Sequence, residues 1–385
     1  MGKLNINLKQ VASFTIVTAV SFGLGMTIPH ASTDSIASGT HPKQTNEQKI
    51  DNQIKHMTLN EKIGQLFVTG VSNNKAATKH DIKKYHLGGI ILMGNNFVGS
   101  KASFKHRLSS YQRSAKIPLT ISTDQEGGTV SRLSANKRIS GHSYYLSPQQ
   151  ALHRGGMKKV LSMYRYQAKQ LHSLGINWDF APVADVSMHK GSFIYDRTIG
   201  KGYAKTSKYI AASVPAIQNQ HVAATLKHFP GYGSAADTHT GSASVTRSLK
   251  SFEAKDFRPF KAGIKSGVDS VMVTHIILKK IDPHKPASLS KKDIHLLRQN
   301  LGFKGVIVSD SLQMQAVGNY ATSHHVYRDV AAFKAGNDVL LTSDYKRGIP
   351  QLKRAIAKKQ VSVKQVNASV KRILTMKAKI GLINR

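Results

Sequence analysis

The chain has 385 residues, 40% of them apolar, which suits either two or three average domains or one large α/β barrel. It has no cysteine, which excludes a disulfide framework, a thiolate nucleophile and zinc–thiolate sites. Its 56 Lys plus Arg outnumber 20 Asp plus Glu, for a formal net charge of +36.

The N-terminus has the pattern of an export signal. Lys3 and Lys9 flank the start of an uncharged, largely apolar run over 11–26, shorter than the roughly 20 residues of a membrane span. We therefore predict a signal peptide at 1–31 and a secreted, cell-surface or wall-associated protein. An uncleaved N-terminal membrane anchor is the alternative, and the lack of cysteine excludes lipoprotein processing.

Residues 32–49 are polar and are predicted to form a spacer, followed by one folded domain over 50–385. In that domain, short β-branched runs alternate with amphipathic stretches. The predicted strands are 65–69, 89–93, 119–122, 176–180, 223–227, 270–274, 306–309 and 338–341. The predicted helices include 151–172, 203–218, 252–265 and 291–300. This alternation predicts a single (β/α)8 TIM-type barrel with enlarged loops after strands three, four and five, and a doubly wound open sheet is the alternative.

Polar side chains follow the predicted strands at their carboxyl ends, where barrel enzymes build their sites. Carboxylates are scarce in this chain, so their positions are informative. The residues in question are Asp124, Glu126, Asp185, His228, Asp237, His275, Asp310 and Asp344. We expect them to converge on one mouth of the barrel.

Several reaction classes lack their motifs. His228, Asp237, His239, His275 and Asp310 could supply metal ligands, but the chain has no His-x-His pair and no His-Glu-x-x-His helix. It also lacks the Gly-x-Ser-x-Gly elbow of serine hydrolases and a complete phosphate-binding loop. No metal and no cofactor are therefore predicted.

Glycoside cleavage fits the available groups better. A retaining glycosidase needs a carboxylate nucleophile and a proton donor. Asp310, at the end of a predicted strand, is a candidate nucleophile, with a helix-capping role as its alternative. Asp237 and His239 offer an imidazole donor oriented by a carboxylate, with a surface turn as the alternative.

Several ordered segments resemble bacterial family 3 glycoside hydrolases of the β-N-acetylglucosaminidase (β-N-acetylhexosaminidase) type. They are Thr-Asp-Gln-Glu-Gly-Gly at 123–128 with Arg132, Asp-Arg-Thr-Ile-Gly at 196–200, Lys-His-Phe-Pro-Gly-Tyr-Gly at 227–233, Asp-Thr-His at 237–239, Val-Ser-Asp-Ser-Leu-Gln-Met at 308–314 and Ala-Gly-Asn-Asp-Val-Leu at 335–340. The resemblance runs from about Asp51 to the C-terminus, and it implies that 50–385 is a catalytic domain.

The resemblance also implies roles for residues of this chain. Asp310 would be the nucleophile that forms a covalent glycosyl-enzyme, and His239 would be the acid/base with Asp237 as its partner. The first-subsite sugar would be bound by Asp124, Arg132, Arg197, Lys227 and His228. As alternatives, Arg132 and Arg197 would only add to the positive charge that binds the wall, and Lys227 would pair with Asp185 or another carboxylate at the mouth.

The chain departs from the family pattern at two positions. Tyr232 stands where a histidine is common, and Ser311 stands where a second aspartate is frequent. We expect neither to abolish turnover, although both could alter the leaving-group side or the hydrogen bonding around Asp310. Many other members carry their acid/base on an added sandwich domain, for which 385 residues leave no room, and this favours the loop histidine.

Export and positive charge indicate the substrate class. We expect exo-acting removal of terminal β-linked N-acetylglucosamine from peptidoglycan fragments, with chitin oligosaccharides as the alternative. A histidine donor is neutral once its proton has left, so phosphate could replace water as acceptor, and phosphorolysis stays open. A wall-binding barrel without catalysis is the third alternative.

The basic residues are spread along the chain, which predicts association with anionic wall polymers. No nucleic-acid motif occurs, so nucleic acid is not an expected partner. No stable protein partner is predicted either.

Overall fold

The computed structural model describes residues 44–72 and 74–383. The predicted signal peptide and the spacer up to residue 43 lie outside this part of the chain. From Gln44 onward the chain forms one compact unit. Among the helices of the described residues, none is both long enough and apolar enough to cross a membrane.

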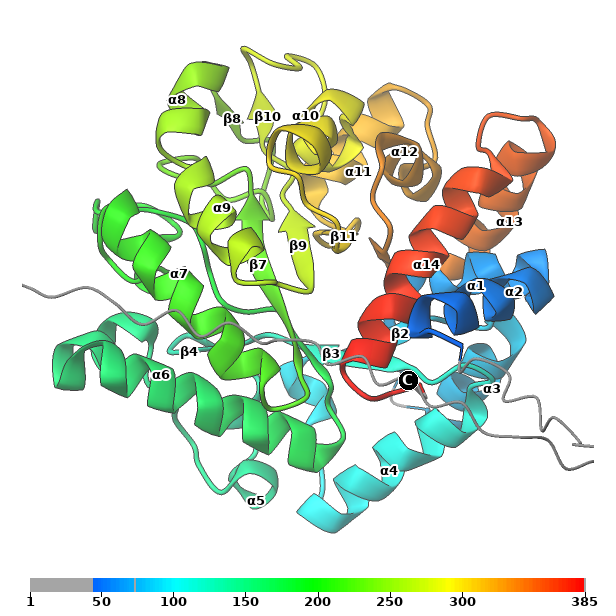
Figure 1. The fold of residues 1–385 in the computed structure, drawn as a ribbon, viewed down its shortest axis with the longest axis horizontal. Helices are drawn as coiled ribbons and strands as arrows, with labels where there is room; N and C mark the ends of the chain where they lie inside the picture. The colour runs from blue at the N-terminus through cyan, green and yellow to red at the C-terminus, as the bar shows by residue number, and fades with distance from the viewer. Residues whose placement is uncertain (1–43, 73, 384–385) are drawn as a thin grey trace, which may run out of the picture. The chain divides into compact units, whose positions relative to one another are not determined.

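Parallel strands form the wall of a barrel (Figure 1). They are β1 (Phe67–Gly70), β2 (Gly89–Leu92), β3 (Thr120–Thr123), β6 (Trp178–Asp179), β7 (Ala223–Phe229), β9 (Ser270–Val273), β11 (Val306–Ser309) and β12 (Leu340–Leu341). Their order is β11-β9-β7-β6-β3-β2-β1-β12. A parallel bridge between Val308 and Val339 joins the two ends of that order. This closure confirms the predicted (β/α)8 barrel over the open sheet.

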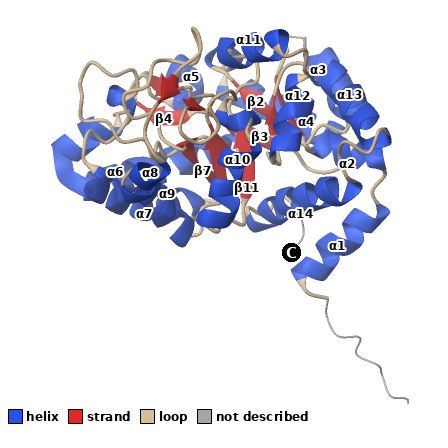
Figure 2. Cartoon of the chain, turned by 90° about the horizontal axis from the view of Figure 1, so that it is seen from above, coloured by secondary structure: helices blue, strands red, loops and turns tan. Residues whose placement is uncertain are grey.

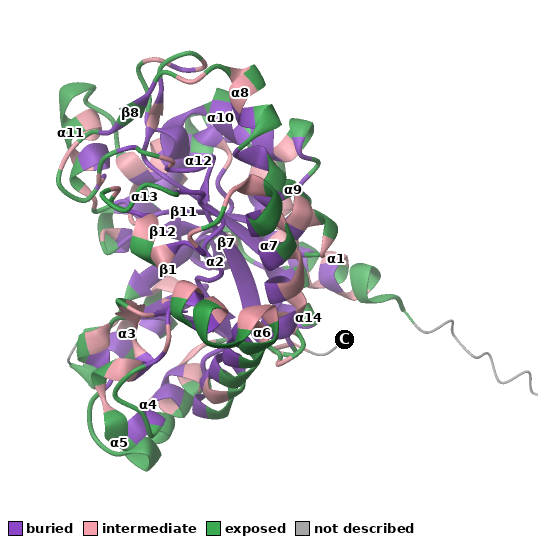
Figure 3. Ribbon diagram, turned by 90° about the vertical axis from the view of Figure 1, so that its left-hand side faces the viewer, coloured by how far each residue is buried: buried purple, intermediate pink, exposed green. Residues whose placement is uncertain are grey.

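Helices surround the strands on the outside (Figure 2). They are α1 (Asn46–His56), α2 (Leu59–Gln65), α3 (Lys75–Tyr85), α4 (Lys101–Ser114), α5 (Lys137–Ser140), α6 (Pro148–Leu174), α7 (Tyr203–Gln218), α8 (Leu249–Ala254), α9 (Phe257–Lys265), α10 (Lys291–His295), α11 (Gln315–Ser323), α12 (Arg328–Ala335), α13 (Tyr345–Ala357) and α14 (Val363–Lys379). Strands such as β7 and β11 are buried along their whole length, whereas outward helix faces are exposed (Figure 3). Burial on both faces explains why the strands read as continuous apolar or β-branched runs.

Helix α1 begins at Asn46, inside the range predicted as spacer. Thr45 caps it by accepting a hydrogen bond from the backbone of Gln48, whose side chain bonds back to the cap. Ile50 and Ile54 are buried on its inner face, and α1 packs beside α14 (Figure 1). The last residues of the polar stretch are therefore the first turn of a docked helix.

Three predicted helices are interrupted. The stretch 151–172 lies in α6, which is kinked at Gly155 and Gly156, where the backbone angles are not helical. The stretch 252–265 is split into α8 and α9 at Lys255, whose φ of −125° and ψ of −86° are not helical. The buried Asp256, paired with Arg247, lies directly after the break. The stretch 291–300 is α10 followed by a π-helical segment over Leu296–Asn300.

The enlarged loops predicted after strands three, four and five are present, between β3 and α6, β6 and α7, and β7 and α8. The segment after β9 is long as well, which the sequence analysis missed. It carries β10 (Ile277–Leu278), which pairs in parallel with β8 (Ser244–Val245) from the loop after β7. This small sheet ties the loops of strands five and six together.

Candidate active site

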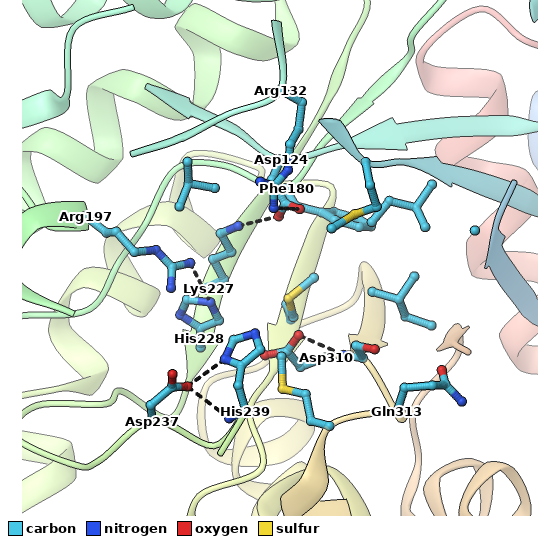
Figure 4. A pocket seen from close by; sticks show the side chains of 18 of the residues that line it. Asp124, Arg132, Phe180, Arg197, Lys227, His228, Asp237, His239, Asp310 and Gln313 are labelled. Atoms are coloured by element: carbon cyan, nitrogen blue, oxygen red, sulfur yellow. Dashed lines mark hydrogen bonds and ion pairs between the residues drawn. The ribbon is translucent and has the colours of Figure 1, made fainter. Parts of the chain in front are cut away.

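A pocket of about 670 Å³ lies at the carboxyl ends of the barrel strands (Figure 4). Every residue predicted for the site lines it: Asp124, Arg132, Arg197, Lys227, His228, Asp237, His239 and Asp310. They come from loops and strand ends between residues 124 and 310, almost half of the sequence. The barrel therefore brings these eight residues together, as expected for side chains that follow parallel strands. Of the other polar residues expected at the mouth, Glu126, Asp185, His275 and Asp344 do not line the pocket, and Asp344 pairs with Arg347.

Asp310 follows the last residue of β11 and is held rigidly. Its backbone N–H donates to the carbonyl of Val273 at 2.9 Å, and its Oδ1 accepts from the N–H of Ser311 at 2.7 Å. The next helix, α11, begins at Gln315 with Met314 as its cap residue, so the helix-capping alternative for Asp310 is wrong. Asp310 is 7% exposed, and Oδ2 is the oxygen left to face the pocket.

Asp237 and His239 lie in contact on the loop after β7. The Nδ1 atom of His239 is 2.6 Å from Asp237 Oδ1, which also accepts the backbone N–H of His239 at 2.9 Å. Because an ionised carboxylate can only accept, Nδ1 carries a hydrogen and Nε2 is left for another partner. Both side chains line the pocket, so the pair lies at the candidate site.

A buried ion network lies at the back of the pocket. Lys227 Nζ contacts Asp124 Oδ1 at 2.8 Å and Glu126 Oε1 at 2.6 Å. Glu126, which is fully buried, also accepts two hydrogen bonds from Arg197, 2.9 Å from Nε and 2.7 Å from a terminal nitrogen. Buried charges are tolerated only when paired in this way. Arg197 is therefore part of the site, and Lys227 pairs with Asp124 and Glu126 instead of Asp185.

The network keeps its carboxylates ionised. Burial alone would raise the pKa of Asp124, but Lys227 and Arg132 outweigh it and hold that pKa well below the usual range. Burial is likewise outweighed at Glu126, where Arg197 and Lys227 lower the pKa to about 2. The two carboxylates in turn raise the pKa of Lys227 against the effect of its burial. At neutral pH the pocket thus presents charged acceptors and donors suited to sugar hydroxyl and amide groups.

Asp185 organises the segment that carries His228. Its Oδ2 accepts the backbone N–H of His228 at 3.0 Å and lies 2.7 Å from His228 Nδ1. A terminal nitrogen of Arg197 is 3.2 Å from Nε2 of the same ring. Because a guanidinium only donates, Nε2 accepts and Nδ1 carries the hydrogen bound by Asp185. The ring of His228 is therefore fixed in one tautomer and one orientation.

Glu126 and Asp185 were expected at the mouth, and Asp185 only as a possible partner of Lys227. Their position after strands three and four was the available signal, and their observed partners could not be read from it. Asp196 lies in a quoted motif, but no role was predicted for it. The apolar part of the lining, which includes Met93, Phe180, Phe193 and Met314, was not predicted to reach the site. These residues come from different loops and strand ends, so no single pattern groups them.

His275, one of the candidate metal ligands, has both ring nitrogens engaged. Nε2 is 2.9 Å from the carbonyl of Ser311, which can only accept, and Nδ1 is 2.7 Å from the hydroxyl of Ser288. Burial lowers the pKa of His275. Over the parts of the chain that the structure covers, no group of three or more His, Asp or Glu side chains is placed to hold a metal ion.

Comparison with known proteins gives one consistent family. A sequence model described as the glycosyl hydrolase family 3 N terminal domain matches residues 58–376. A beta-hexosaminidase of Xanthomonas oryzae pv. oryzae is 33% identical over 266 residues, covering 66% of this chain and 76% of that protein. Beta-hexosaminidase LpqI of Mycobacterium tuberculosis is 30% identical over 333 residues, covering 82% of each.

A solved structure agrees in fold. A glycoside hydrolase family 3 β-N-acetylglucosaminidase from Paenibacillus sp. matches with a TM-score of 0.78 and 29% sequence identity. The match covers 85% of this chain but 63% of that one, so this chain spans less than two thirds of the Paenibacillus protein.

Proposed function

The chain belongs to glycoside hydrolase family 3 and is a glycoside hydrolase, and from that premise we propose that it is a retaining β-N-acetylglucosaminidase (β-N-acetylhexosaminidase). The observation that carries the proposal is one pocket lined by a strand-end carboxylate, Asp310, and by the Asp237–His239 pair. The names of the similar proteins support the choice of an N-acetylhexosamine as the sugar. Exo action on a terminal sugar follows from the family resemblance.

In the proposed first step, Asp310 attacks the anomeric carbon of the bound sugar. The bond from that carbon to the leaving oxygen breaks while His239 gives its proton to this oxygen, and a glycosyl-aspartate forms. In the second step, His239 takes a proton from water as the water oxygen attacks the anomeric carbon. The bond to Asp310 breaks and the carboxylate is restored. Two inversions give net retention of configuration.

The charged groups behind the reacting centre would hold the sugar. Asp124 would accept from sugar hydroxyls, and Lys227, Arg132 and Arg197 would donate to hydroxyl and acetamido oxygens. His228 would also contact the sugar, and the support is that all five residues line the pocket. The network orients these groups before substrate arrives, so little reorganisation is needed on binding.

For the natural substrate we propose peptidoglycan fragments that carry a terminal β-linked N-acetylglucosamine. The support is the net charge of +36, which suits an anionic wall, together with the export signal predicted at 1–31. Chitin oligosaccharides differ only on the leaving side of the bond. Parallel assays on muropeptides and on chitobiose would rank the two substrates by kcat/KM.

The central experiment compares the wild type with Asp310→Asn and His239→Ala on p-nitrophenyl N-acetyl-β-glucosaminide and on chitobiose. Asp310→Asn should lose at least about 10³-fold in kcat on both substrates, because no covalent intermediate can form. His239→Ala should lose about 10²-fold or more on chitobiose and far less in kcat/KM on the nitrophenyl glycoside, whose leaving group needs little protonation. Full activity of Asp310→Asn would overturn the mechanism.

The same assay separates the alternatives. Formation of N-acetylglucosamine 1-phosphate on addition of phosphate would mean phosphorolysis, which the imidazole donor of His239 makes chemically reasonable. A wild type that binds the sugar but releases nothing from either substrate would mean a wall-binding barrel without catalysis.

A further inference from the structure

Thr238 lies between the two residues of the acid/base pair, yet its side chain is fully buried while theirs reach the pocket. Its Oγ1 is 2.5 Å from the phenolic oxygen of Tyr232, which is itself 1% exposed and does not line the pocket. We propose that Tyr232 is a positioning residue, and that the Tyr232–Thr238 hydroxyl pair sets the orientation of His239 for proton transfer. This proposal rests on the proposed function.

The Tyr232–Thr238 hydroxyl pair provides the main hydrogen bond between this loop and the rest of the described protein. From residue 236 to residue 242, the only hydrogen bonds to described residues outside that segment come from the hydroxyl of Thr238. The other bonds there are internal, from the backbone and ring of His239 and from the hydroxyl of Thr240 to Asp237. A segment with so few outside bonds has many accessible conformations unless a side chain fixes it.

The direction of the bond can be inferred from Met314. Thr238 Oγ1 lies 3.8 Å from the sulfur of Met314, toward which its single hydrogen can point. With the Thr238 hydrogen on Met314, Tyr232 would donate and Thr238 would accept, and in either direction the two hydroxyls share one hydrogen bond. Burial, together with the nearby Asp310, raises the pKa of Tyr232, so the phenol keeps its hydrogen at physiological pH. Ionisation of Tyr232 therefore does not break the bond at physiological pH.

Tyr232 is itself held in place by several contacts, as a residue that positions a loop must be. Its backbone N–H donates to Asp185 Oδ1 at 2.7 Å, the carboxylate that also fixes His228. Its ring meets the ring of His228 edge-on, with centroids 5.2 Å apart, and lies 5.7 Å from the ring of Phe193. Phe193 in turn meets the ring of His239 at 6.2 Å. The sugar-binding end of β7 and the proton-transfer loop are thus joined through one side chain.

The consequence is selective for proton transfer. Asp310 and the ion network do not depend on the loop for their positions, so removing the Tyr232 hydroxyl should leave sugar binding and nucleophilic attack largely intact. What should fall is the fraction of molecules in which His239 faces the leaving oxygen. The loss should appear with leaving groups that need a proton and be small with those that do not.

The experiment measures kcat/KM, which reports the first step, for the wild type, Tyr232→Phe, Thr238→Val and Thr238→Ser on both substrates. Tyr232→Phe and Thr238→Val should each lose about tenfold or more on chitobiose and less than about threefold on the nitrophenyl glycoside. Thr238→Ser keeps a hydroxyl and should recover most of the chitobiose activity. The double variant Tyr232→Phe/Thr238→Val should be little worse than either single one, because both remove the same bond.

A second tyrosine pair supplies the matched control. Tyr209 and Tyr164 share a buried hydroxyl contact of 2.6 Å between α7 and α6, and neither lines the pocket. Tyr209→Phe should cost stability without any difference between the two substrates. Equal losses of Tyr232→Phe on both substrates, or none on either, would overturn the positioning role while Asp310→Asn remained inactive. An inactive wild type would instead mean that the proposed function has failed.

Discussion

Glu126 has the most connected side chain of the buried network at the back of the pocket. It contacts both Lys227 and Arg197, and it is fully buried. Removing its charge would leave two cations short of a partner in a region of low dielectric. The residue should therefore matter for stability as well as for the geometry of the sugar site.

We expect Glu126→Gln to lower the free energy of unfolding by about 3 kcal/mol at pH 7. The pKa of Glu126 falls from 4.5 to about 2 on folding, because its cations outweigh its burial. A carboxyl group whose pKa is lower in the folded state contributes its full stabilisation of the folded protein above pH 4.5. That contribution is lost as the pH falls toward 2. Urea denaturation at pH 7, 5 and 3 should show the variant approaching the wild type at the acid end.

Glu61 provides the control for this prediction. It pairs with Lys116, whose side chain is 71% exposed, and it caps α2 through Thr58. Glu61→Gln keeps an acceptor for the cap and should cost less than about 1 kcal/mol. If Glu126→Gln were as mild, or if its cost did not change with pH, the network would not hold the carboxylate as described.

At the residue scale, sequence patterns predicted which side chains reach the pocket and that Asp237 pairs with His239, but not the pairings between distant residues. Asp310, Asp237 and His239 were identifiable because they lie in short motifs that follow predicted strands. The bond from Arg197 to Glu126 joins residues 71 positions apart, and that from His228 to Asp185 spans 43. Such pairings are set by the relative positions of barrel strands, which no local pattern contains.

At the scale of elements, helix α9 packs unusually close to the strand that carries Lys227 and His228. The contact is made through Gly263: a Cβ atom there would lie 2.5 Å from Leu226 of β7 and 2.9 Å from Ile210 of α7. Real Cβ atoms do not approach other atoms so closely, so a larger residue would force the buried Leu226 and Ile210 side chains, or α9 itself, to shift.

We expect Gly263→Ala to destabilise the protein by about 1–2 kcal/mol, although alanine is the better helix former by about 1 kcal/mol. Displacement of β7 should also reduce kcat/KM. Gly318→Ala is the matched comparison, because a Cβ at Gly318 in α11 meets nothing within 4 Å. That variant should gain about 0.5–1 kcal/mol in thermal or urea denaturation. A stabilised Gly263→Ala would contradict the close packing.

The elements themselves were largely predictable. Strands such as β2, β9 and β11 are buried on both faces, so their sequences are runs of apolar and β-branched residues that stand out from the helices. The break at Lys255 was not predictable, because the apolar spacing continues across it. The two-residue strands β8 and β10 were missed for a different reason, since two residues carry no periodicity.

At the scale of the whole molecule, the formal charge of +36 is the dominant property. Charges of one sign spread over a surface attract polyanions through a long-range field that salt screens. We propose on this basis that the protein associates with anionic wall polymers, which fits the predicted export.

Binding to purified cell walls should weaken by at least tenfold between 50 mM and 500 mM salt, because the screening length shrinks well below 10 Å. Cosedimentation at several salt concentrations measures this directly. Walls stripped of their phosphate-containing polymers should bind less protein at low salt. Binding that ignores both salt and stripping would rule out an electrostatic association.

The pocket lining differs in charge from the rest of the protein. It contains four carboxylates, from Asp124, Asp196, Asp237 and Asp310, against three cations, from Arg132, Arg197 and Lys227. The carboxylates thus outnumber the Lys and Arg side chains of the lining by one, within a chain of formal charge +36. An anionic polymer that binds the basic surface of the protein is not attracted into a pocket with this lining. We therefore expect the adsorbed enzyme to have the same KM for a neutral glycoside as the enzyme in free solution.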